Sequence, residues 1–199
     1  MRTFSCDIET DGIDANVVWC ISVHDIDTDE VTTFAGTCLD LFKSWVETDA
    51  DCLIFHNGIA FDVPVLENLM GIDFSEILVE DTLIMSQLYK PRLDGGHSLS
   101  AWGDRLGFAK GDYDDWSKFT DEMLQYCIRD TKVTTKVYKY LLANKLSADA
   151  KGLEYKTKEH CSLQEKTGWF FNLQGAIELL VEINDDLRLA EEKVHKTFV

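Results

Sequence analysis

The sequence predicts an α/β fold, with a mixed five-stranded sheet flanked by helices and a helical extension at the C-terminal end. Segments with strand-like periodicity alternate with helix-like segments over residues 1–145. From residue 146 onward the pattern is mainly helical. The chain has 199 residues, of which 45% are hydrophobic, so it can bury a core of its own. We therefore expect two parts, residues 1–145 and residues 146–199.

The stretch Thr3–Ile13 holds the first predicted strand, which a turn at Asp11-Gly12 ends, and it carries the most informative pair of residues. Apolar and polar residues alternate along it, so Asp7 and Glu9 project from the same face. Two carboxylates this close repel each other unless a cation lies between them. A hard divalent ion such as Mg2+ or Mn2+ prefers carboxylate oxygen. The alternative is an edge strand with a solvated acidic face, and later segments have to decide between the two.

Further strands and a helix precede the next polar motif. The residue pattern predicts strands at Val17–Ile26, Val31–Phe34 and Cys52–Phe55, and a short helix at Leu39–Val46. The third of these strands is a continuous apolar run, typical of a central strand that is covered on both faces. It leads into a loop of sequence HNG, after which Asp62 falls in the opening turn of a helix. An acidic residue there can also simply complement the helix dipole.

The middle of the chain is predicted to be mainly structural. Ile77–Val79 fits a strand, and Asp81 is placed to cap a helix over Thr82–Tyr89. No second metal ligand is spaced to join His97, so we expect a structural role for it. The loop Gly107–Trp116 carries three aspartates and is interpreted as solvated surface.

Two helices surround that loop, and a separate helical part follows them. A short helix contains Leu99 and Leu106, and a long one covers roughly Asp121–Leu142. Tyr126 and Asp130 are four residues apart in the long helix, so they lie on one face. In the last part we expect a helix at Leu146–Lys166, a short strand or turn at Gly168–Phe171, and a final amphipathic helix that Asn172 caps.

Composition excludes several classes of protein. The net charge is −17, and residues 1–150 hold 27 acidic and 12 basic residues, so the chain lacks the basic surface of an autonomous nucleic-acid binder. The six cysteines are scattered and form no C-x-x-C pair, which supports neither a disulfide framework nor a zinc site. No apolar run reaches the ~18 residues of a membrane span, and no signal-peptide pattern opens the chain. We expect a cytoplasmic protein.

Three motifs now stand in order: D-x-E, H-N-G-x-x-F-D and Y-x-x-x-D. Together they resemble the DEDDy exonucleases, proofreading 3′→5′ exonucleases with four acidic residues and a tyrosine on a ribonuclease-H-like (DnaQ-like) fold. The segments FHNGIAFDVPVL at residues 55–66 and QEKTGWFFN at residues 164–172 narrow the resemblance to podovirus-type replicative DNA polymerases of family A. The second segment is similar to the start of the polymerase domain. The palm, fingers and thumb of that family have no counterpart, so we expect no polymerase activity.

The resemblance implies a metal-dependent hydrolase that releases nucleoside 5′-monophosphates from DNA 3′ ends. Asp7, Glu9 and Asp130 would hold one divalent ion, Mg2+ or Mn2+, which activates the attacking water. Asp7 would bridge to a second ion, which Asp62 would serve largely through water. Tyr126 would orient the attacking water.

The same resemblance implies contacts to the substrate. Thr10 would hydrogen-bond the terminal nucleotide, and Ile13 would pack on its base. Asn57 stands at a substrate-binding position, whereas Phe61 is expected to belong to the core.

Alternatives to a DNA exonuclease stay open at this point. An exoribonuclease of the same fold would use the same acidic residues, and an assembly subunit of a polymerase could lack activity altogether. The implied partners are single-stranded DNA 3′ ends and a DNA polymerase, either as a separate chain or as the remainder of the same chain.

Overall fold

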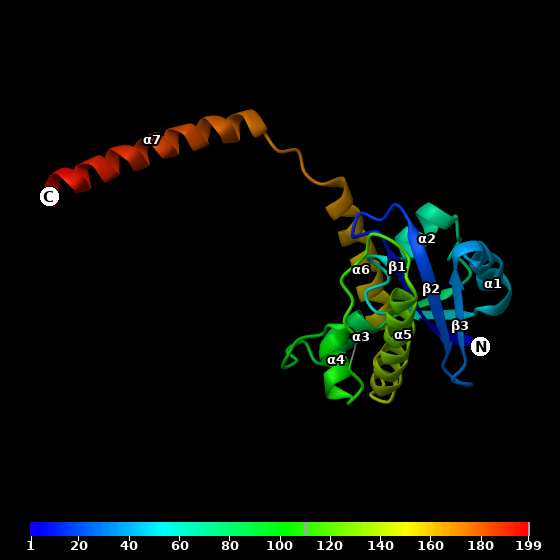
Figure 1. The fold of residues 1–199 in the computed structure, drawn as a ribbon. Helices are drawn as coiled ribbons and strands as arrows, with labels where there is room; N and C mark the ends of the chain where they lie inside the picture. Colours follow the sequence, from blue (N-terminus) through cyan, green and yellow to red (C-terminus); the bar gives the residue numbers. More distant parts are fainter. Residues whose placement is uncertain (110, 199) are drawn as a thin grey trace. The chain divides into compact units, whose positions relative to one another are not determined.

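The computed structural model describes residues 1–109 and 111–198, which form two units. Met1–Ser162 is the first compact unit and Leu163–Val199 is the second. The sheet and the residues of all three acidic motifs belong to the first unit (Figure 1).

The sheet is mixed and has five strands, as predicted. In spatial order it runs β3-β2-β1-β4-β5. Its strands are β1 (Thr3–Thr10), β2 (Val18–Asp25), β3 (Val31–Ala35), β4 (Cys52–Phe55) and β5 (Leu78–Asp81). β1 pairs antiparallel with β2 and parallel with β4, which itself pairs parallel with β5. The strand that carries the D-x-E motif is therefore the central strand and not an edge.

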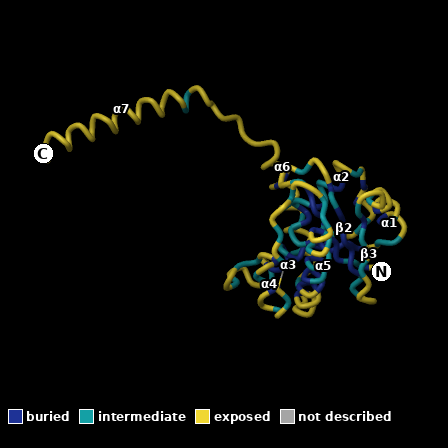
Figure 2. The backbone as a smooth tube through the Cα atoms, in the orientation of Figure 1, coloured by how far each residue is buried: buried dark blue, intermediate teal, exposed yellow. Residues whose placement is uncertain are grey.

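Helices cover both faces of the sheet. They are α1 (Leu41–Asp49), α2 (Asp62–Met70), α3 (Thr82–Tyr89), α4 (Leu99–Arg105), α5 (Asp121–Leu142), α6 (Ala148–Thr167) and α7 (Leu173–Thr197), and a short 3-10 turn spans Gly36–Cys38. Leu53 and Phe55 of β4 belong to one core cluster, which includes residues of α1 and α2. Cys52 and Ile54 belong to a second cluster with residues of α3, α4 and α5. Alternate residues of one strand thus fill two cores. The dark blue, buried stretches of Figure 2 all lie in the first unit.

A polar seam holds α5 against the sheet. The hydroxyl of Ser5 on β1 donates to the carbonyl of Thr131 at 2.8 Å and lies 2.6 Å from the hydroxyl of Thr135. The ring Nδ1 of His24 on β2 lies 2.7 Å from the same Thr135 hydroxyl. Buried polar groups that satisfy one another in this way fix the register between two elements. The seam therefore sets which residues of α5 lie beside the D-x-E motif.

Several local predictions are confirmed. The carboxylate of Asp81 accepts from the amides of Leu83 and Ile84, as a helix cap does. His97 has a structural role, since its Nδ1 lies 2.6 Å from the hydroxyl of Ser86 and its Nε2 lies 3.3 Å from the carbonyl of Pro91. The cysteines are all free thiols. Within the described residues, no helix has the length and apolar character needed to span a bilayer.

The first strand ends where predicted, and one later segment differs. β1 ends at Thr10, directly before the predicted turn at Asp11-Gly12, because the ladder shifts register between Glu9 and Thr10 and the carboxylate of Asp11 then accepts from the amides of Asn16 and Val17. Residues 168–171, for which a short strand or turn was predicted, form no strand. The chain therefore bends away directly after the D-x-E motif.

Candidate metal centre

The acidic motifs meet at one cavity of about 240 Å3. Asp7 and Glu9 come from β1, Asp62 from the start of α2, and Asp130 from α5. The described lining of this cavity is Asp7, Ile8, Glu9, His56, Asn57, Phe61, Asp62, Trp116, Tyr126 and Asp130. The structure thus brings together four acidic residues, Tyr126 and Asn57, as the motifs predicted. We call it the carboxylate cavity.

The strand period explains why both residues of the D-x-E motif point to the same place. Cys6 and Ile8 belong to the core cluster that includes α1 and α2 residues. Ser5 points to α5, as its hydrogen bond to Thr131 shows. Asp7 and Glu9 share the face of Ser5, so they face α5 and its Asp130.

The HNG loop has a conformation that few other sequences could adopt. Asn57 has a φ of 70°, a left-handed conformation that asparagine tolerates better than most residues. A Cβ at Gly58 would lie 2.2 Å from the Cβ of Phe55. Any side chain there would push the loop off β4. The glycine therefore lets the chain turn tightly enough to start α2 at Asp62, beside the carboxylate cavity.

Asp81 anchors this loop from the neighbouring strand. Its carboxylate accepts from the amide of Asn57 at 3.0 Å and from that of Ile59 at 3.2 Å. The same carboxylate caps α3, so one buried side chain ties two segments together. Burial raises the pKa of Asp81 above its ordinary value, and the amide donors act in the opposite direction. Asp81 thus fixes the loop that carries Asn57 and leads to Asp62.

A second anchor ties α6 to the same strand. Tyr155 donates its hydroxyl to Glu80 at 2.6 Å and accepts from the amide of Asp81 at 3.2 Å. Lys151 forms an ion pair with the buried Glu80. The first turns of α6 therefore pack against the C-terminal end of β5, where Glu80 and Asp81 lie.

Electrostatics make the carboxylate cavity costly for the folded chain alone. Glu9, Asp62 and Asp130 are 6%, 6% and 2% exposed. Burial raises the pKa of Asp62 to about 7, with a smaller contribution from the negative charge of Asp81. Hydrogen bonds from the backbone amides of Asp62 and Ile8 act in the opposite direction. A cation in the cavity would favour the ionised carboxylates, and an all-oxygen acidic donor set is the kind that Mg2+ and Mn2+ prefer.

Cys127 lies among the acidic residues and was not predicted from the sequence. Ligand atoms of Asp7, Glu9 and Cys127 lie within 4.8 Å of one another. The thiol, however, lies 3.3 Å from the carbonyl oxygen of Asp7 and donates to it. Burial raises the pKa of the Cys127 thiol well above its ordinary value. A protonated thiol is a poor ligand for a hard ion, so we interpret Cys127 as packing that holds β1 against α5.

The loop before α5 packs on Tyr126, which corrects the prediction that Gly107–Trp116 is only solvated surface. The three aspartates of this loop are exposed, as expected. The ring of Trp116 lies 5.8 Å from that of Tyr126, and the ring of Tyr113 lies 5.9 Å from it, centroid to centroid. Trp19 on β2 fixes the loop by donating to the carbonyl of Trp116 at 3.1 Å. These aromatic rings join an irregular loop to the helix that follows it. Contacts of this kind leave no periodic signal in the sequence, so the prediction missed them.

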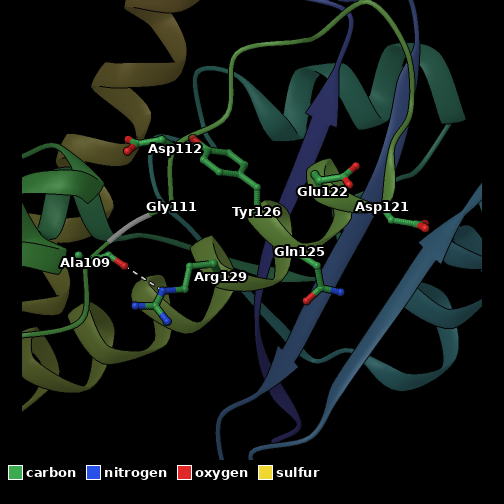
Figure 3. Close-up of a pocket in the computed structure, with 8 residues that line it drawn as sticks. All are labelled: Ala109, Gly111, Asp112, Asp121, Glu122, Gln125, Tyr126 and Arg129. Carbon is green, nitrogen blue, oxygen red and sulfur yellow. Dashed lines mark hydrogen bonds between the residues drawn. The ribbon is translucent and has the colours of Figure 1, made fainter.

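A second cavity, of about 600 Å3, has Tyr126 in common with the carboxylate cavity, and Figure 3 shows the residues that line it. Its lining includes three carboxylates and the guanidinium of Arg129. The Nε of Arg129 donates to the carbonyl of Ala109 at 2.8 Å, and its guanidinium lies 3.7 Å from the ring centroid of Phe108. Among the described lining residues negative charge is in excess, which opposes a phosphodiester backbone.

Three residues with an expected substrate role lie in different surroundings. Asn57 lines the carboxylate cavity. Thr10 and Ile13 are not among its described lining residues. Thr10 is buried, and its hydroxyl donates to the carbonyl of Gly12 at 2.9 Å. Ile13 is 90% exposed, in the bend that follows β1.

His56 and Phe61 also line the cavity, and no site role was predicted for either. The hydroxyl of Thr82 donates its one hydrogen to the carbonyl of Phe55. The same hydroxyl oxygen lies 2.8 Å from the Nδ1 of His56 and can only accept from it, so this Nδ1 carries a proton. Phe61 is only partly buried and packs against the first core cluster, as predicted, while another part of it lines the cavity.

Comparison with known proteins places this chain in a family. Residues 5–142 match the RNase_H superfamily, and the chain belongs to it. Over most of its length it is also similar to phage polymerases. In an alignment of 243 positions, it is 26% identical to the DNA-directed DNA polymerase of Escherichia phage T7. This alignment covers 89% of this chain and 34% of the polymerase. The corresponding polymerase of Enterobacteria phage T3 is 26% identical over 208 residues, with 74% and 29% covered. The chain thus spans about a third of the length of these relatives.

Solved structures show the same fold at low sequence identity. NrnC of Brucella melitensis with bound Mg2+ superimposes with a TM-score of 0.63 at 19% identity, covering 85% of this chain and 87% of NrnC. RNase D of Trypanosoma brucei gives a TM-score of 0.62 at 15% identity, covering 81% and 66%. These likenesses establish the ribonuclease-H-like fold that the sequence resemblance implied.

Proposed function

We propose that this chain is a metal-dependent 3′→5′ exonuclease that hydrolyses phosphodiester bonds at DNA 3′ ends and proofreads for a replicative DNA polymerase. One observation carries the proposal: four carboxylates from β1, α2 and α5 line a single cavity together with Tyr126. A solvated acidic surface does not account for them, because three of the four are almost fully buried.

Two divalent ions fit the donor set of the carboxylate cavity. Asp7, Glu9 and Asp130 would hold one, and Asp7 with Asp62 would serve the other. When bound, such a pair supplies a water of lowered pKa and positive charge for the leaving oxygen. NrnC, which has the same fold, has been solved with Mg2+. These assignments account for the cost of gathering four carboxylates.

The other residues of the carboxylate cavity have roles in positioning. A phenol is a weak base at neutral pH, so Tyr126 orients a water by hydrogen bonding and does not deprotonate it. Tyr113 and Trp116 hold the ring of Tyr126 in place through their aromatic contacts. Asn57, fixed by Asp81, is available to a nucleotide in the cavity. Thr10 and Ile13 remain proposed contacts to the terminal nucleotide, and for Ile13 its exposure leaves an apolar side chain open to a base.

The polymerase relatives favour DNA over RNA as the substrate. RNase D shares the fold, so an exoribonuclease is the second candidate function. A matched pair of 5′-labelled oligonucleotides, one DNA and one RNA, separates the two. Faster release from RNA would replace the DNA assignment. A chain that bound a polymerase but released nothing with any divalent ion would instead be an inactive assembly subunit.

The direct test is nucleotide release from a 5′-labelled single strand in Mg2+. The wild type should shorten it stepwise from the 3′ end and release nucleoside 5′-monophosphates. Asp7→Ala should reduce the rate by at least about a thousandfold, because it removes a shared ligand. Asp14→Ala changes an exposed aspartate outside the carboxylate cavity and serves as the matched control. Equal rates for wild type and Asp7→Ala would refute the proposal.

A further inference from the structure

The helix α7 carries an apolar heptad repeat. Leu173, Leu180, Leu187 and Val194 follow one another at intervals of seven, and three small or branched residues alternate with them, Ala176, Ile183 and Ala190. In heptad notation the first set occupies the a positions and the second the d positions. The repeat covers just over three heptads, the length at which it indicates coiled-coil packing. We call these seven residues the α7 seam.

Nothing within its own unit covers the α7 seam. No described residue of α7 is buried. Its five large apolar members, Leu173, Leu180, Ile183, Leu187 and Val194, are between 53% and 64% exposed. Trp169 and Phe170, directly before the helix, are 90% and 96% exposed. A contiguous apolar surface of this kind marks an interaction site.

The flanking charges argue against a second copy of the chain as the partner. α7 holds six acidic and three basic residues, and Arg188 is paired internally with Asp185 and Glu192. In a parallel pair of α7 helices, the g position Asp186 of each would face the e position Glu191 of the other. Like charges across a seam oppose pairing, whereas lysine or arginine at these partner positions favours it. The seam therefore fits a helix with basic flanks.

The alignment to the phage polymerases points to the source of that helix. It covers 89% of this chain, whereas the first unit, residues 1–162, makes up only about 81% of the 199 residues. Part of the second unit therefore aligns to the polymerase, and about two-thirds of the polymerase lies outside the alignment. In those relatives, the segment that aligns with part of the second unit belongs to the same polypeptide as the DNA polymerase activity for which the relatives are named.

We propose that α7 is a docking helix whose seam binds a helix with apolar a and d residues and basic flanks, supplied by the polymerase polypeptide. The identity of the partner rests on the proposed function, whereas the chemistry of the docked helix rests on α7 alone. The exonuclease reaches its substrate attached to the polymerase through this contact.

The test uses the full chain and two synthetic peptides of about four heptads. One has leucine at a and d and lysine at e and g, and the other has glutamate at e and g. Leu180→Glu/Leu187→Glu places two charges in the seam, and Val181→Glu/Leu189→Glu places the same charges outside it as the matched control. Binding is measured by calorimetry at low and high salt. Sedimentation reports the oligomeric state, and release from a single strand reports the activity.

The proposal expects the basic peptide to bind the wild type and the control variant, and the seam variant at least about a hundredfold more weakly. The lysine peptide should outcompete the glutamate peptide at low salt, and by less at high salt. Undiminished binding to the seam variant would overturn the proposal. So would a wild-type dimer that only the seam variant dissociates, which would make a second copy the occupant. A change in nuclease rate in the seam variant would also overturn the proposal, because it would indicate that the seam packs against the chain's own first unit. Loss of activity in every protein would instead refute only the proposed function.

Discussion

Replacing Asp62 by asparagine should stabilise the folded chain when metal is absent. Burial raises the pKa of this carboxyl from its ordinary 3.8 to about 7. Each tenfold change in proton affinity corresponds to about 1.4 kcal/mol. Ionising Asp62 in the folded chain therefore costs about 4 kcal/mol more than in the unfolded chain. Asparagine has nearly the same shape, can still accept the amide hydrogen bonds, and does not titrate.

The sign follows from proton binding. Between about pH 4 and pH 7 the unfolded chain has released this proton while the folded chain still holds it. Stability therefore falls as pH rises through that window, and the loss is complete above it. In EDTA, Asp62→Asn should be more stable than the wild type by up to about 4 kcal/mol at pH 8, and the difference should largely vanish near pH 4. Bound Mg2+ should narrow this difference at pH 8, since saturation at a hundred times Kd adds about 2.7 kcal/mol to the protein that keeps the ligand.

Urea unfolding at pH 4 and pH 8, each in EDTA and in Mg2+, measures these differences. Asp104→Asn, at an exposed aspartate of α4, controls for the substitution itself. The reasoning is refuted if Asp62→Asn in EDTA destabilises the protein equally at both pH values. That result would mean that the folded chain ionises Asp62 as readily as the unfolded chain does.

Three further predictions concern the carboxylate cavity and its substrate. Tyr126→Phe should lower the single-turnover rate by about 10–100-fold and leave stabilisation by metal unchanged, because the hydroxyl positions water but binds no ion. An unchanged rate would show that the hydroxyl does not position the water. Millimolar Mn2+ should raise the melting temperature of the wild type but not that of Asp7→Ala, since only the folded wild type assembles the full donor set; equal shifts would show that the ion binds elsewhere. The isolated chain should shorten a single strand faster than a blunt duplex, because its net charge of −17 gives it little electrostatic attraction for a duplex. Gel assays on the two substrates test this.

The sequence predicts most of the carboxylate cavity because its acidic residues stand at regular positions of regular elements. The strand period alone places Asp7 and Glu9 on one face, and the helix period places Tyr126 and Asp130 together. That these two pairs meet depends on long-range packing through Ser5, which no local pattern contains. The order and spacing of the three motifs supplied that information through the family resemblance.

The errors arise where side chains override the local pattern. Trp116 follows several exposed aspartates, so composition suggested a solvated loop, whereas its ring packs on Tyr126. Cys127 fits the apolar stripe of α5, and only the tertiary structure shows it beside the acidic residues. Each of these contacts joins residues whose relation is invisible to a short window of sequence.

The net charge of −17 connects the carboxylate cavity with the proposed docking helix. A phosphodiester strand approaching the first unit meets strong repulsion, and the carboxylate cavity itself contributes four acidic residues to it. Divalent ions would reverse the local charge only where the scissile bond lies, so they explain cleavage but not capture of the strand. A strand held at the carboxylate cavity would then need basic surface on a partner, and the helix proposed to dock on α7 has basic flanks of that kind. The negative charge argues against a nuclease that captures strands by itself. It is compatible with a nuclease whose partner delivers the strand.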